Sequence, residues 1–168
     1  MTGGYIGLGT NLGDRLANIN KAISLLSQHI NIIKASSVYE TEPEGYKGQP
    51  DFFNCVVLAD VSVDARALVI ILKDMEKQMG RVDSFAGGPR LIDADLLFHG
   101  REVINQPGLV VPHPRIQQRL FVLVPLAEIA ADFIHPVLHK TILQLLGESD
   151  SRSWVVKAGE IEFNLAGE

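Results

Sequence analysis

The sequence predicts an α+β fold in which two helices pack on one face of a mostly antiparallel sheet. Three observations support this prediction. The chain has 168 residues, a length that suits one domain, and 46% of them are hydrophobic, which is enough for one buried core. Segments of strand and helix character then follow one another in the order β-α-β-β-α-β. We therefore expect residues 1–168 to form a single domain.

The first half of the chain contains one helix and three strand-like segments. Residues 4–9 form a short apolar segment that ends in the polar turn 10–14, and apolar residues then recur at helical spacing up to Leu26. Segments 30–39 and 53–61 are rich in β-branched and apolar residues, which is typical of strands. The connection between them is predicted to be a long, structured loop because it carries Pro43, Gly45, Gly48 and Pro50.

The second half of the predicted core is a helix followed by a strand. Apolar residues at helical spacing indicate a helix from about residue 64 that ends at Gly80, since glycine suits the position after a helix. Residues 91–98 form the last core strand, and His99-Gly100 turns the chain into an extra hairpin through Val103-Ile104. The resulting order, βαββαβ, is that of the ferredoxin-like plait.

C-terminal helices and a terminal hairpin are predicted beyond this core. His113-Pro114 opens a helical region that runs to about residue 131, with Pro125 expected to kink or divide it. Residues 141–146 form a short helix ended by Gly147. Alternating apolar residues at the end of the chain predict a hairpin over 153–165 that turns at Ala158-Gly159.

Composition limits the classes of partner. The formal net charge is −5 and no lysine and arginine run is present, so we expect no nucleic acid partner. No apolar segment is long enough to cross a membrane and no secretion signal is visible, so we expect a cytoplasmic protein. We expect it to be a monomer or a weak homo-oligomer. The one cysteine, Cys55, is interpreted as a small buried hydrophobic residue without chemistry.

Asp93 and Asp95 are the most informative pair of residues. In a strand they share one face, and Ile92, Ala94, Leu96 and Phe98 share the other. The Cα atoms of such a pair lie about 7 Å apart, so a cation between them would relieve their repulsion. Mg²⁺ fits this geometry because it takes one or two carboxylates and completes its shell with phosphates and water. The alternative is a solvated strand face that happens to carry two aspartates.

The glycine-rich segment Gly7-Leu8-Gly9-Thr10-Asn11-Leu12-Gly13 lies between a strand and a helix. Its spacing differs from that of a dinucleotide fingerprint and no parallel β-α-β unit follows. A tight turn with close backbone packing is therefore favoured, with Gly9 as a place where a flat group lies against the backbone.

Arginines surround the aspartate strand in the sequence. Arg115 and Arg119, four residues apart, are expected on one face of the helix that begins at His113, and Arg81 and Arg90 flank the strand from the other side. Guanidinium groups suit phosphate oxygens, and a histidine adds a hydrogen bond. Together with the two aspartates they indicate Mg²⁺-assisted phosphoryl chemistry, in which catalysis is mostly positioning and charge neutralisation.

Five motifs in order resemble those of the 6-hydroxymethyl-7,8-dihydropterin pyrophosphokinase family. They are YIGLGTNLGDR at 5–15, SSVYET at 36–41, QPDFFN at 49–54, GPRLIDAD at 88–95 and VPHPR at 111–115. The resemblance extends to about residue 136. It implies transfer of the β,γ-pyrophosphoryl group of ATP to a reduced pterin, with two Mg²⁺ ions held by Asp93 and Asp95. It implies catalytic roles for Arg81, Arg90, Asp93 and Asp95, and ATP binding by Glu76, Arg90, His113 and Arg119.

The same resemblance implies a pterin pocket. Asn54 matches the residue that reads the pterin edge, and Phe52 and Phe121 match the aromatic pair that sandwiches the ring. These types suit a flat heterocycle, because aromatic rings stack on it and an amide offers a donor and an acceptor. Core packing is the alternative role for the two phenylalanines. The full set implied for the pterin is Gly9, Thr41, Glu44, Phe52, Asn54 and Phe121, with Thr41 and Glu44 contributing backbone.

The chain departs from the family pattern in three places. Asp83 stands where many relatives carry arginine, Gly87 where many carry tryptophan, and Gly108 where some carry arginine. We expect loop 81–88, which is one residue shorter than in some relatives, to be a mobile lid over ATP. Two other functions remain open at this point: a non-catalytic pterin or nucleotide binder with a degenerate lid, and an unrelated metal-dependent nucleotide hydrolase on the same fold.

Overall fold

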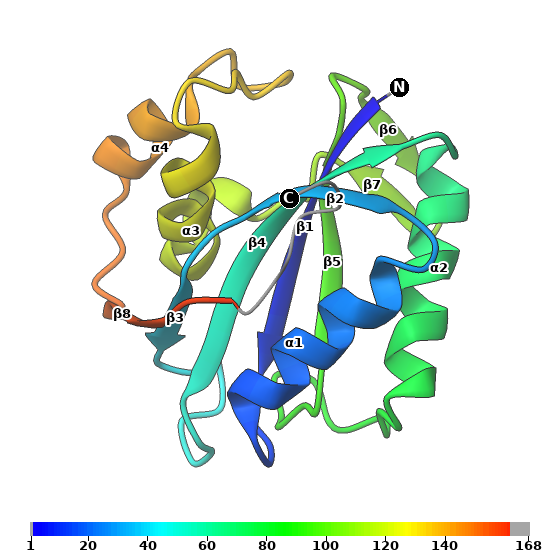
Figure 1. The fold of residues 1–168 in the computed structure, drawn as a ribbon. Coiled ribbons are helices and arrows are strands. Elements are labelled where there is room, and N and C mark those ends of the chain that lie inside the picture. Colours follow the sequence, from blue (N-terminus) through cyan, green and yellow to red (C-terminus); the bar gives the residue numbers. More distant parts are fainter. Residues whose placement is uncertain (1, 162–168) are drawn as a thin grey trace.

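The computed structural model describes residues 2–161, and its main feature is a six-stranded sheet in which every strand pair is antiparallel (Figure 1). The sheet follows the order β5-β1-β4-β3-β8, and β2 also pairs with β4. Its strands are β1 (Thr2–Thr10), β2 (Asn31–Ala35), β3 (Val38–Thr41), β4 (Phe52–Val61), β5 (Asp93–His99) and β8 (Val155–Gly159). The helices are α1 (Arg15–Leu26), α2 (Ala65–Gln78), α3 (Leu120–Ala130) and α4 (Ile142–Glu148).

The order β1-α1-β2-β4-α2-β5 confirms the predicted ferredoxin-like plait. The extra hairpin also forms: β6 (Ile104–Gln106) and β7 (Leu109–Val111) pair in a separate two-stranded sheet. Gly108 occupies its turn at φ +75°, a conformation that favours glycine. The backbone conformation of this turn therefore explains why glycine occupies position 108.

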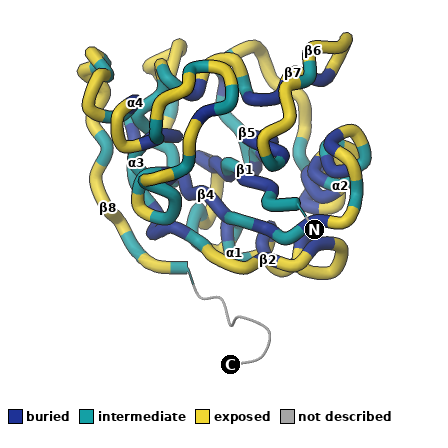
Figure 2. The backbone as a smooth tube through the Cα atoms, turned by 90° about the horizontal axis from the view of Figure 1, so that it is seen from above, coloured by how far each residue is buried: buried dark blue, intermediate teal, exposed yellow. Residues whose placement is uncertain are grey.

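Helices cover the two faces of the sheet unequally (Figure 1). Helices α1 and α2 pack on one face over a core that includes Ile6 and Leu8 of β1. Helix α3, with α4 against it, covers part of the opposite face over a second core that includes Tyr5. The central strands β1, β4 and β5 are therefore buried between two layers (Figure 2). The uncovered part of the second face is the place where a pocket can open.

Both helices of the plait begin at an aspartate. The Asp14 side chain accepts a hydrogen bond from the Ala17 backbone N–H, and Asp64 accepts one from Ala67, so each caps a helix N-terminus. Helix α2 ends at Gln78, and Gly80 follows at φ +89° as predicted for a glycine that terminates a helix. Gly80 thus begins the loop that leads to β5.

The predicted strand over residues 30–39 is two strands. β2 ends at Ala35 and β3 begins at Val38, because Ser36 and Ser37 direct their polar groups elsewhere. The Ser36 side chain accepts a hydrogen bond from the Val56 backbone N–H at 2.9 Å, and Glu128 of α3 accepts bonds from both the Ser37 N–H and hydroxyl. These side-chain hydrogen bonds interrupt the strand, so residues 30–39 do not pair with β4 as one continuous strand.

A β-bulge corrects the prediction for Phe98. The β1–β5 register shifts between Tyr5, which pairs with Phe98, and Ile6, which pairs with Leu96. Leu97 is the extra residue, so Leu97 and Phe98 both enter the second core, whereas Ala94 and Leu96 enter the first. The alternation that places Asp93 and Asp95 together is confirmed, because it lies before the bulge.

The helix predicted to begin at His113-Pro114 begins later. A 3₁₀ turn covers Ile116–Gln118, and α3 starts at Leu120 after an extended Arg119. Because His113 precedes a proline, its backbone is biased away from helical geometry. Arg115 and Arg119 therefore do not share a helical face. Helix α3 runs through Pro125 without being divided.

Two predictions near the C-terminus also change. Helix α4 passes Gly147 and ends at Glu148, and its N-terminus is fixed by a capping box between Thr141 and Gln144. β8 runs through Ala158 and Gly159, where the hairpin turn was predicted, and pairs with β3 instead. The second arm of that hairpin was predicted over residues 160–165, of which residues 162–165 lie outside the described residues.

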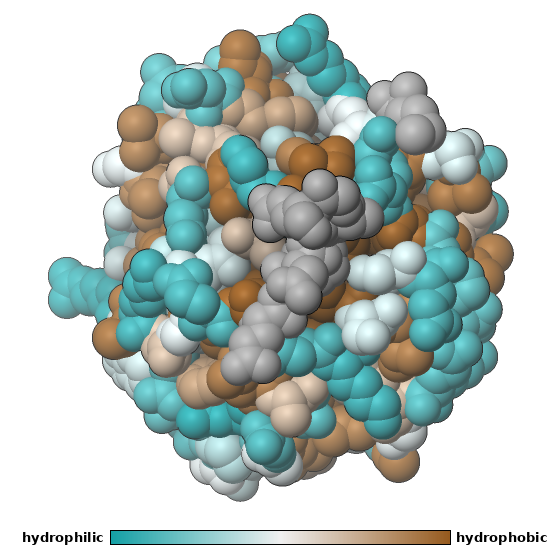
Figure 3. All heavy atoms as spheres, viewed as in Figure 1, coloured by the Kyte–Doolittle hydropathy of each residue, from teal (hydrophilic) through white to brown (hydrophobic). Residues whose placement is uncertain are grey.

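No helix in residues 2–161 is long and apolar enough to cross a membrane. Hydrophilic side chains are interspersed with apolar ones on the face shown in Figure 3.

Candidate active site

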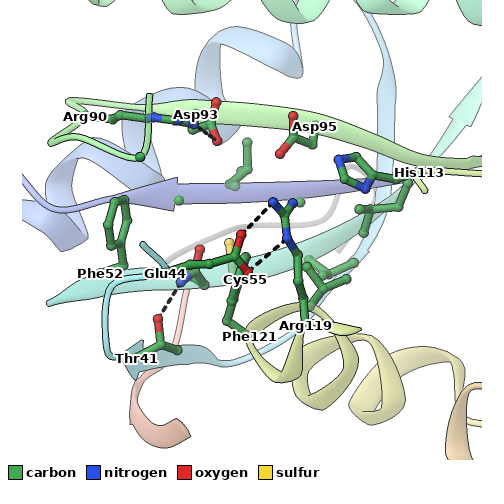
Figure 4. Close-up of a pocket in the computed structure, with 18 of the residues that line it drawn as sticks. Thr41, Glu44, Phe52, Cys55, Arg90, Asp93, Asp95, His113, Arg119 and Phe121 are labelled. Atoms are coloured by element: carbon green, nitrogen blue, oxygen red, sulfur yellow. Dashed lines mark hydrogen bonds and ion pairs between the residues drawn. The ribbon is translucent and has the colours of Figure 1, made fainter. Parts of the chain in front are cut away.

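A pocket of about 290 Å³ opens on the sheet face that carries α3 (Figure 4). Its floor comes from β1, β4 and β5, and its walls come from the N-terminal end of α3 and from two loops. These loops connect β3 to β4 (residues 42–51) and α2 to β5 (residues 79–92). Most of the predicted site residues line it: Gly9, Thr41, Glu44, Phe52, Asn54, Arg90, Asp93, Asp95, His113, Arg119 and Phe121.

Asn54 is held at one end of the pocket by its neighbours. Its Nδ2 donates to the Thr41 hydroxyl at 2.8 Å, which points Oδ1 toward β1. A Cβ at Gly9 would lie 2.6 Å from that Oδ1. Glycine is therefore required at position 9 by the Asn54 amide, which is 8% exposed and fixed in orientation. The sequence analysis expected a flat group against the Gly9 backbone. The protein group that lies there is the Asn54 amide, and a ligand at this position stays a prediction.

Two phenylalanine rings belong to the same pocket. Phe52 and Phe121 both line the pocket, from the start of β4 and the first turn of α3 respectively. The Arg119 guanidinium lies 5.4 Å from the centre of the Phe121 ring. Cys55 is 1% exposed, as predicted for a small buried hydrophobic residue, and burial raises the pKa of its thiol to about 12.

Asp93 and Asp95 form the opposite end of the pocket. The Asp93 carboxylate pairs with two arginines: Arg81 Nη1 lies 3.0 Å from Oδ1, and Arg90 Nη1 lies 2.8 Å from Oδ2. Burial and the nearby charge of Asp93 raise the pKa of Asp95 to about 6. An ionised pair at this position thus favours a cation. Within residues 2–161 no three His, Cys, Asp or Glu side chains group into a complete metal site.

Glu76 and Arg81 support this end without lining the pocket. Glu76 is 4% exposed on α2, and its carboxylate lies 2.6 Å from Arg81 Nη1. The resemblance implied that Glu76 binds ATP. In the structure Glu76 holds Arg81 and the backbone between the two aspartates, and its role toward ATP stays a prediction.

His113 lies beside Asp95 on the β5 side of the pocket (Figure 4), and its backbone N–H donates to the Leu97 carbonyl of β5 at 3.0 Å. Burial, together with the positive charges of Arg119 and Arg115, lowers its pKa to about 4, so the ring is neutral at pH 7. Its Nδ1 accepts a hydrogen bond from the Arg115 backbone N–H at 3.1 Å. The ring proton therefore resides on Nε2, which makes His113 a neutral hydrogen-bond donor.

The two loops are joined to each other by contacts that the sequence analysis did not assign. Gln49 Nε2 donates to the Gly87 carbonyl at 2.6 Å, and the rings of Tyr46 and Phe85 meet edge to face at 5.4 Å. Asn11, which is 2% exposed, donates to Gln49 Oε1 at 2.8 Å and accepts from the Arg90 backbone N–H at 2.8 Å. The signal available in the sequence was a polar residue directly after an apolar strand.

The fold and the pocket define a class of protein: a ferredoxin-like α+β domain whose open sheet face holds one ligand pocket, with an amide and aromatic rings at one end and arginines and carboxylates at the other. A sequence model of the 7,8-dihydro-6-hydroxymethylpterin-pyrophosphokinase (HPPK) family matches residues 5–131. The chain belongs to this family, as its motifs predicted.

Relatives of two kinds match the chain. The 2-amino-4-hydroxy-6-hydroxymethyldihydropteridine pyrophosphokinase of Aquifex aeolicus is 41% identical over 145 residues, which are 86% of this chain and 91% of the relative. The protein of the same name from Bacillus subtilis is 39% identical over 161 residues, 95% and 94% of the two chains. Folic acid synthesis protein fol1 of Pneumocystis carinii is 44% identical over 134 residues, 79% of this chain and 18% of that protein. The chain thus spans about a fifth of the fungal protein.

Solved structures agree on the fold. The wild-type HPPK-DHPS of Plasmodium falciparum in complex with pteroate matches with a TM-score of 0.74 at 16% identity, over 88% of this chain and 44% of that chain. The A437G variant with STZ-DHP matches with a TM-score of 0.73 at 17% identity, over 88% and 45%. These matches confirm the α+β fold.

Proposed function

We propose that this chain transfers the pyrophosphoryl group of ATP to 6-hydroxymethyl-7,8-dihydropterin, releasing AMP, as a step of folate biosynthesis. Membership of the HPPK family supports this activity. The observation that carries it here is the continuity of one pocket whose two ends suit the two substrates. The chain would act as a monomer or a weak homo-oligomer, in the cytoplasm, where ATP is available.

The pterin belongs at the end formed by Asn54, Phe52 and Phe121. The fixed Asn54 amide offers an acceptor and a donor to the polar edge of the ring, and Thr41 sets its orientation. The two phenylalanine rings offer stacking surfaces to the heterocycle. Gly9 contributes by leaving room for the amide.

The triphosphate belongs at the end formed by the arginines and aspartates. Arg90 and Arg119 line the pocket, and Arg81 reaches Asp93 from behind β5. Their guanidinium groups suit phosphate oxygens, and the neutral His113 donates a further hydrogen bond from Nε2. These fixed donors would stabilise negative charge that develops on the phosphates.

Asp93 and Asp95 would hold Mg²⁺. Two carboxylates on one strand face fit this ion, because it completes its shell with phosphate oxygens and water rather than with a full protein cage. When bound, the metal neutralises phosphate charge and polarises the phosphoryl group under attack.

The reaction forms a bond between the pterin hydroxymethyl oxygen and the β-phosphorus of ATP. The bond from that phosphorus to the oxygen shared with the α-phosphate breaks, AMP leaves with the electron pair, and the hydroxyl proton is released to water. In this scheme the residues of the chain bind and orient: the amide end fixes the pterin, and the arginine end fixes the triphosphate in line with it.

One assay tests the proposal. The chain is incubated with ATP and Mg²⁺, with and without 6-hydroxymethyl-7,8-dihydropterin, and the nucleotide products are separated. AMP that appears only with the pterin supports the transferase. AMP and free pyrophosphate without the pterin would indicate a nucleotide hydrolase, and binding of both ligands without any product would indicate a non-catalytic binder.

A further inference from the structure

Glu44 holds the guanidinium group of Arg119 in a two-bond pair inside the pocket (Figure 4). Arg119 Nε lies 3.1 Å from Oε2 of Glu44, and Nη2 lies 2.8 Å from Oε1. The planar fork of arginine fits a carboxylate and a phosphate in the same way. A phosphate and Glu44 therefore cannot use these two donors together.

The two partners differ in how firmly they are held. The Arg119 side chain is 16% exposed, whereas the Glu44 side chain is 47% exposed on loop 42–51. Gly45 follows Glu44 at φ +83° and gives this part of the loop an unusual backbone turn. The arginine is thus the fixed partner, and the carboxylate lies on the solvent side.

A second cation lies within reach of Glu44. Arg115 Nη1 is 3.8 Å from Glu44 Oε1, and its side chain is 61% exposed. A carboxylate that leaves Arg119 can therefore pair with Arg115 instead of remaining without a partner. This exchange would lower the cost of clearing the Arg119 donors for a ligand.

The resemblance to the HPPK family gives Glu44 only a backbone role, so its side chain needs another explanation. It belongs to no group of three potential metal ligands within the described residues. Its strong contact is with Arg119, which lines the end of the pocket proposed for the triphosphate.

We infer that the Glu44 carboxylate is an internal competitor for the anion-binding donors of Arg119, which a nucleotide phosphate must displace. Glu44 is then a residue that sets nucleotide affinity, in addition to lining the pocket. This inference rests on the proposed function, because it takes ATP as the ligand at Arg119.

Calorimetry on the full chain tests the inference. The probe is α,β-methylene ATP with Mg²⁺, which resists cleavage at the bond that the reaction breaks. Glu44→Gln keeps the size of the side chain and removes its charge, so the dissociation constant should fall by about three- to tenfold. In an Arg119→Ala background the same substitution should change it by less than twofold, because the competition requires both residues.

Glu40→Gln is the matched control. Glu40 also pairs with an arginine, Arg15, at 2.8 Å, but it lies on β3 outside the pocket lining. Its substitution changes the net charge equally and should leave the dissociation constant within twofold. Thermal melting of each variant establishes that it is folded.

Three outcomes would overturn the inference alone. The first is clear binding by the unaltered chain with no gain in Glu44→Gln. The second is an equal gain in the Arg119→Ala background, which would mean a long-range charge effect. The third is a loss of pterin affinity in Glu44→Gln with nucleotide affinity unchanged, which would mean that the side chain reads the pterin. No nucleotide binding by the unaltered chain would overturn the proposed function together with the inference.

Discussion

The Glu76 carboxylate accepts a hydrogen bond from the backbone N–H of Ala94 at 2.9 Å, so a residue of α2 holds β5 midway between Asp93 and Asp95. The other Glu76 oxygen pairs with Arg81 at 2.6 Å, and the Glu76 side chain is 5% exposed. One buried carboxylate thus ties the helix to the aspartate strand and to the loop that precedes it. The position of the two aspartates depends on this contact.

Replacing Glu76 should therefore destabilise the protein. Glu76→Ala leaves the Ala94 N–H unpaired and removes a partner of Arg81, and we expect the free energy of unfolding to fall by about 3 kcal/mol. Glu76→Gln keeps an acceptor for Ala94 and should cost roughly half as much. Urea unfolding measures both. Weaker ATP binding with unchanged stability would instead favour the direct ATP contact that the family resemblance implied.

Removing either aspartate should abolish transfer while leaving the fold intact. Asp93→Asn and Asp95→Asn each delete a carboxylate that would hold Mg²⁺, and we expect AMP formation to fall by about a hundredfold or more. Asp60→Asn is the matched control, because Asp60 lies near the C-terminal end of β4 and does not line the pocket. Turnover near that of the unaltered chain in either variant, at saturating Mg²⁺ and ATP, would refute the metal assignment.

Gly9→Ala should weaken pterin binding. The new Cβ would lie 2.6 Å from Asn54 Oδ1, so the amide must turn away from the position that Thr41 gives it. An unpaired polar edge costs about 1 to 3 kcal/mol, so pterin affinity should fall at least fivefold while ATP affinity changes little. Asn54→Ala should have the same selectivity, and Gly3→Ala, which meets only Leu58 at 3.4 Å, is the control. A loss confined to ATP would mean that the two ends are assigned backwards.

Local rules predicted the parts of the site that lie on regular strands. Strand alternation placed Asp93 and Asp95 on one face, and that face is the pocket side. The same rule failed at Phe98, because a bulge depends on how β1 and β5 pair and leaves no mark in local spacing. Helical spacing likewise failed at Arg115 and Arg119, where a proline alters the backbone.

Contacts between distant segments could not be predicted from spacing. Glu44 and Arg119 are 75 positions apart in the chain, and their pairing depends on how loop 42–51 meets the start of α3. The contact of Glu76 with Ala94 and Arg81 was missed for the same reason, since the resemblance carries over a position but not the direction of its side chain. Such contacts follow from tertiary packing, which only the folded chain defines.

The neutral state of His113 predicts a dependence of stability on pH. Its pKa is about 4 in the folded protein and about 6.5 when unfolded. Between these values the unfolded state binds more protons, so stability should fall as the pH drops from 6.5 toward 4. Allowing for the partial exposure of the ring, we expect the free energy of unfolding to be about 1 kcal/mol lower at pH 5 than at pH 7.5. Urea unfolding at both values should show a smaller difference in His113→Gln, and equal differences would contradict the assignment.

Loop 81–88 stays predicted to be a lid that closes over the nucleotide. Gly80 and Gly87 adopt φ values of +89° and +75°, which favour glycine, so the tryptophan of many relatives would be strained at Gly87. Contacts of Gly87 with Gln49, and of Phe85 with Tyr46, tie this loop to loop 42–51. We propose that closing the loop costs conformational entropy, which contacts to the phosphates must offset.

Asp83→Arg should therefore strengthen nucleotide binding or raise turnover. Asp83 is exposed on this loop, and a carboxylate there repels a triphosphate, whereas an arginine can pair with it. Asp83→Asn removes the repulsion without adding a contact, so its gain should be smaller than that of arginine. The gains should shrink as salt rises, because salt screens exposed charges. Steady-state kinetics with ATP as the varied substrate, at low and high salt, measure both turnover and the apparent affinity for ATP. Unchanged kinetics at low salt in both variants would mean that Asp83 stays away from the nucleotide and that this loop does not act as a lid.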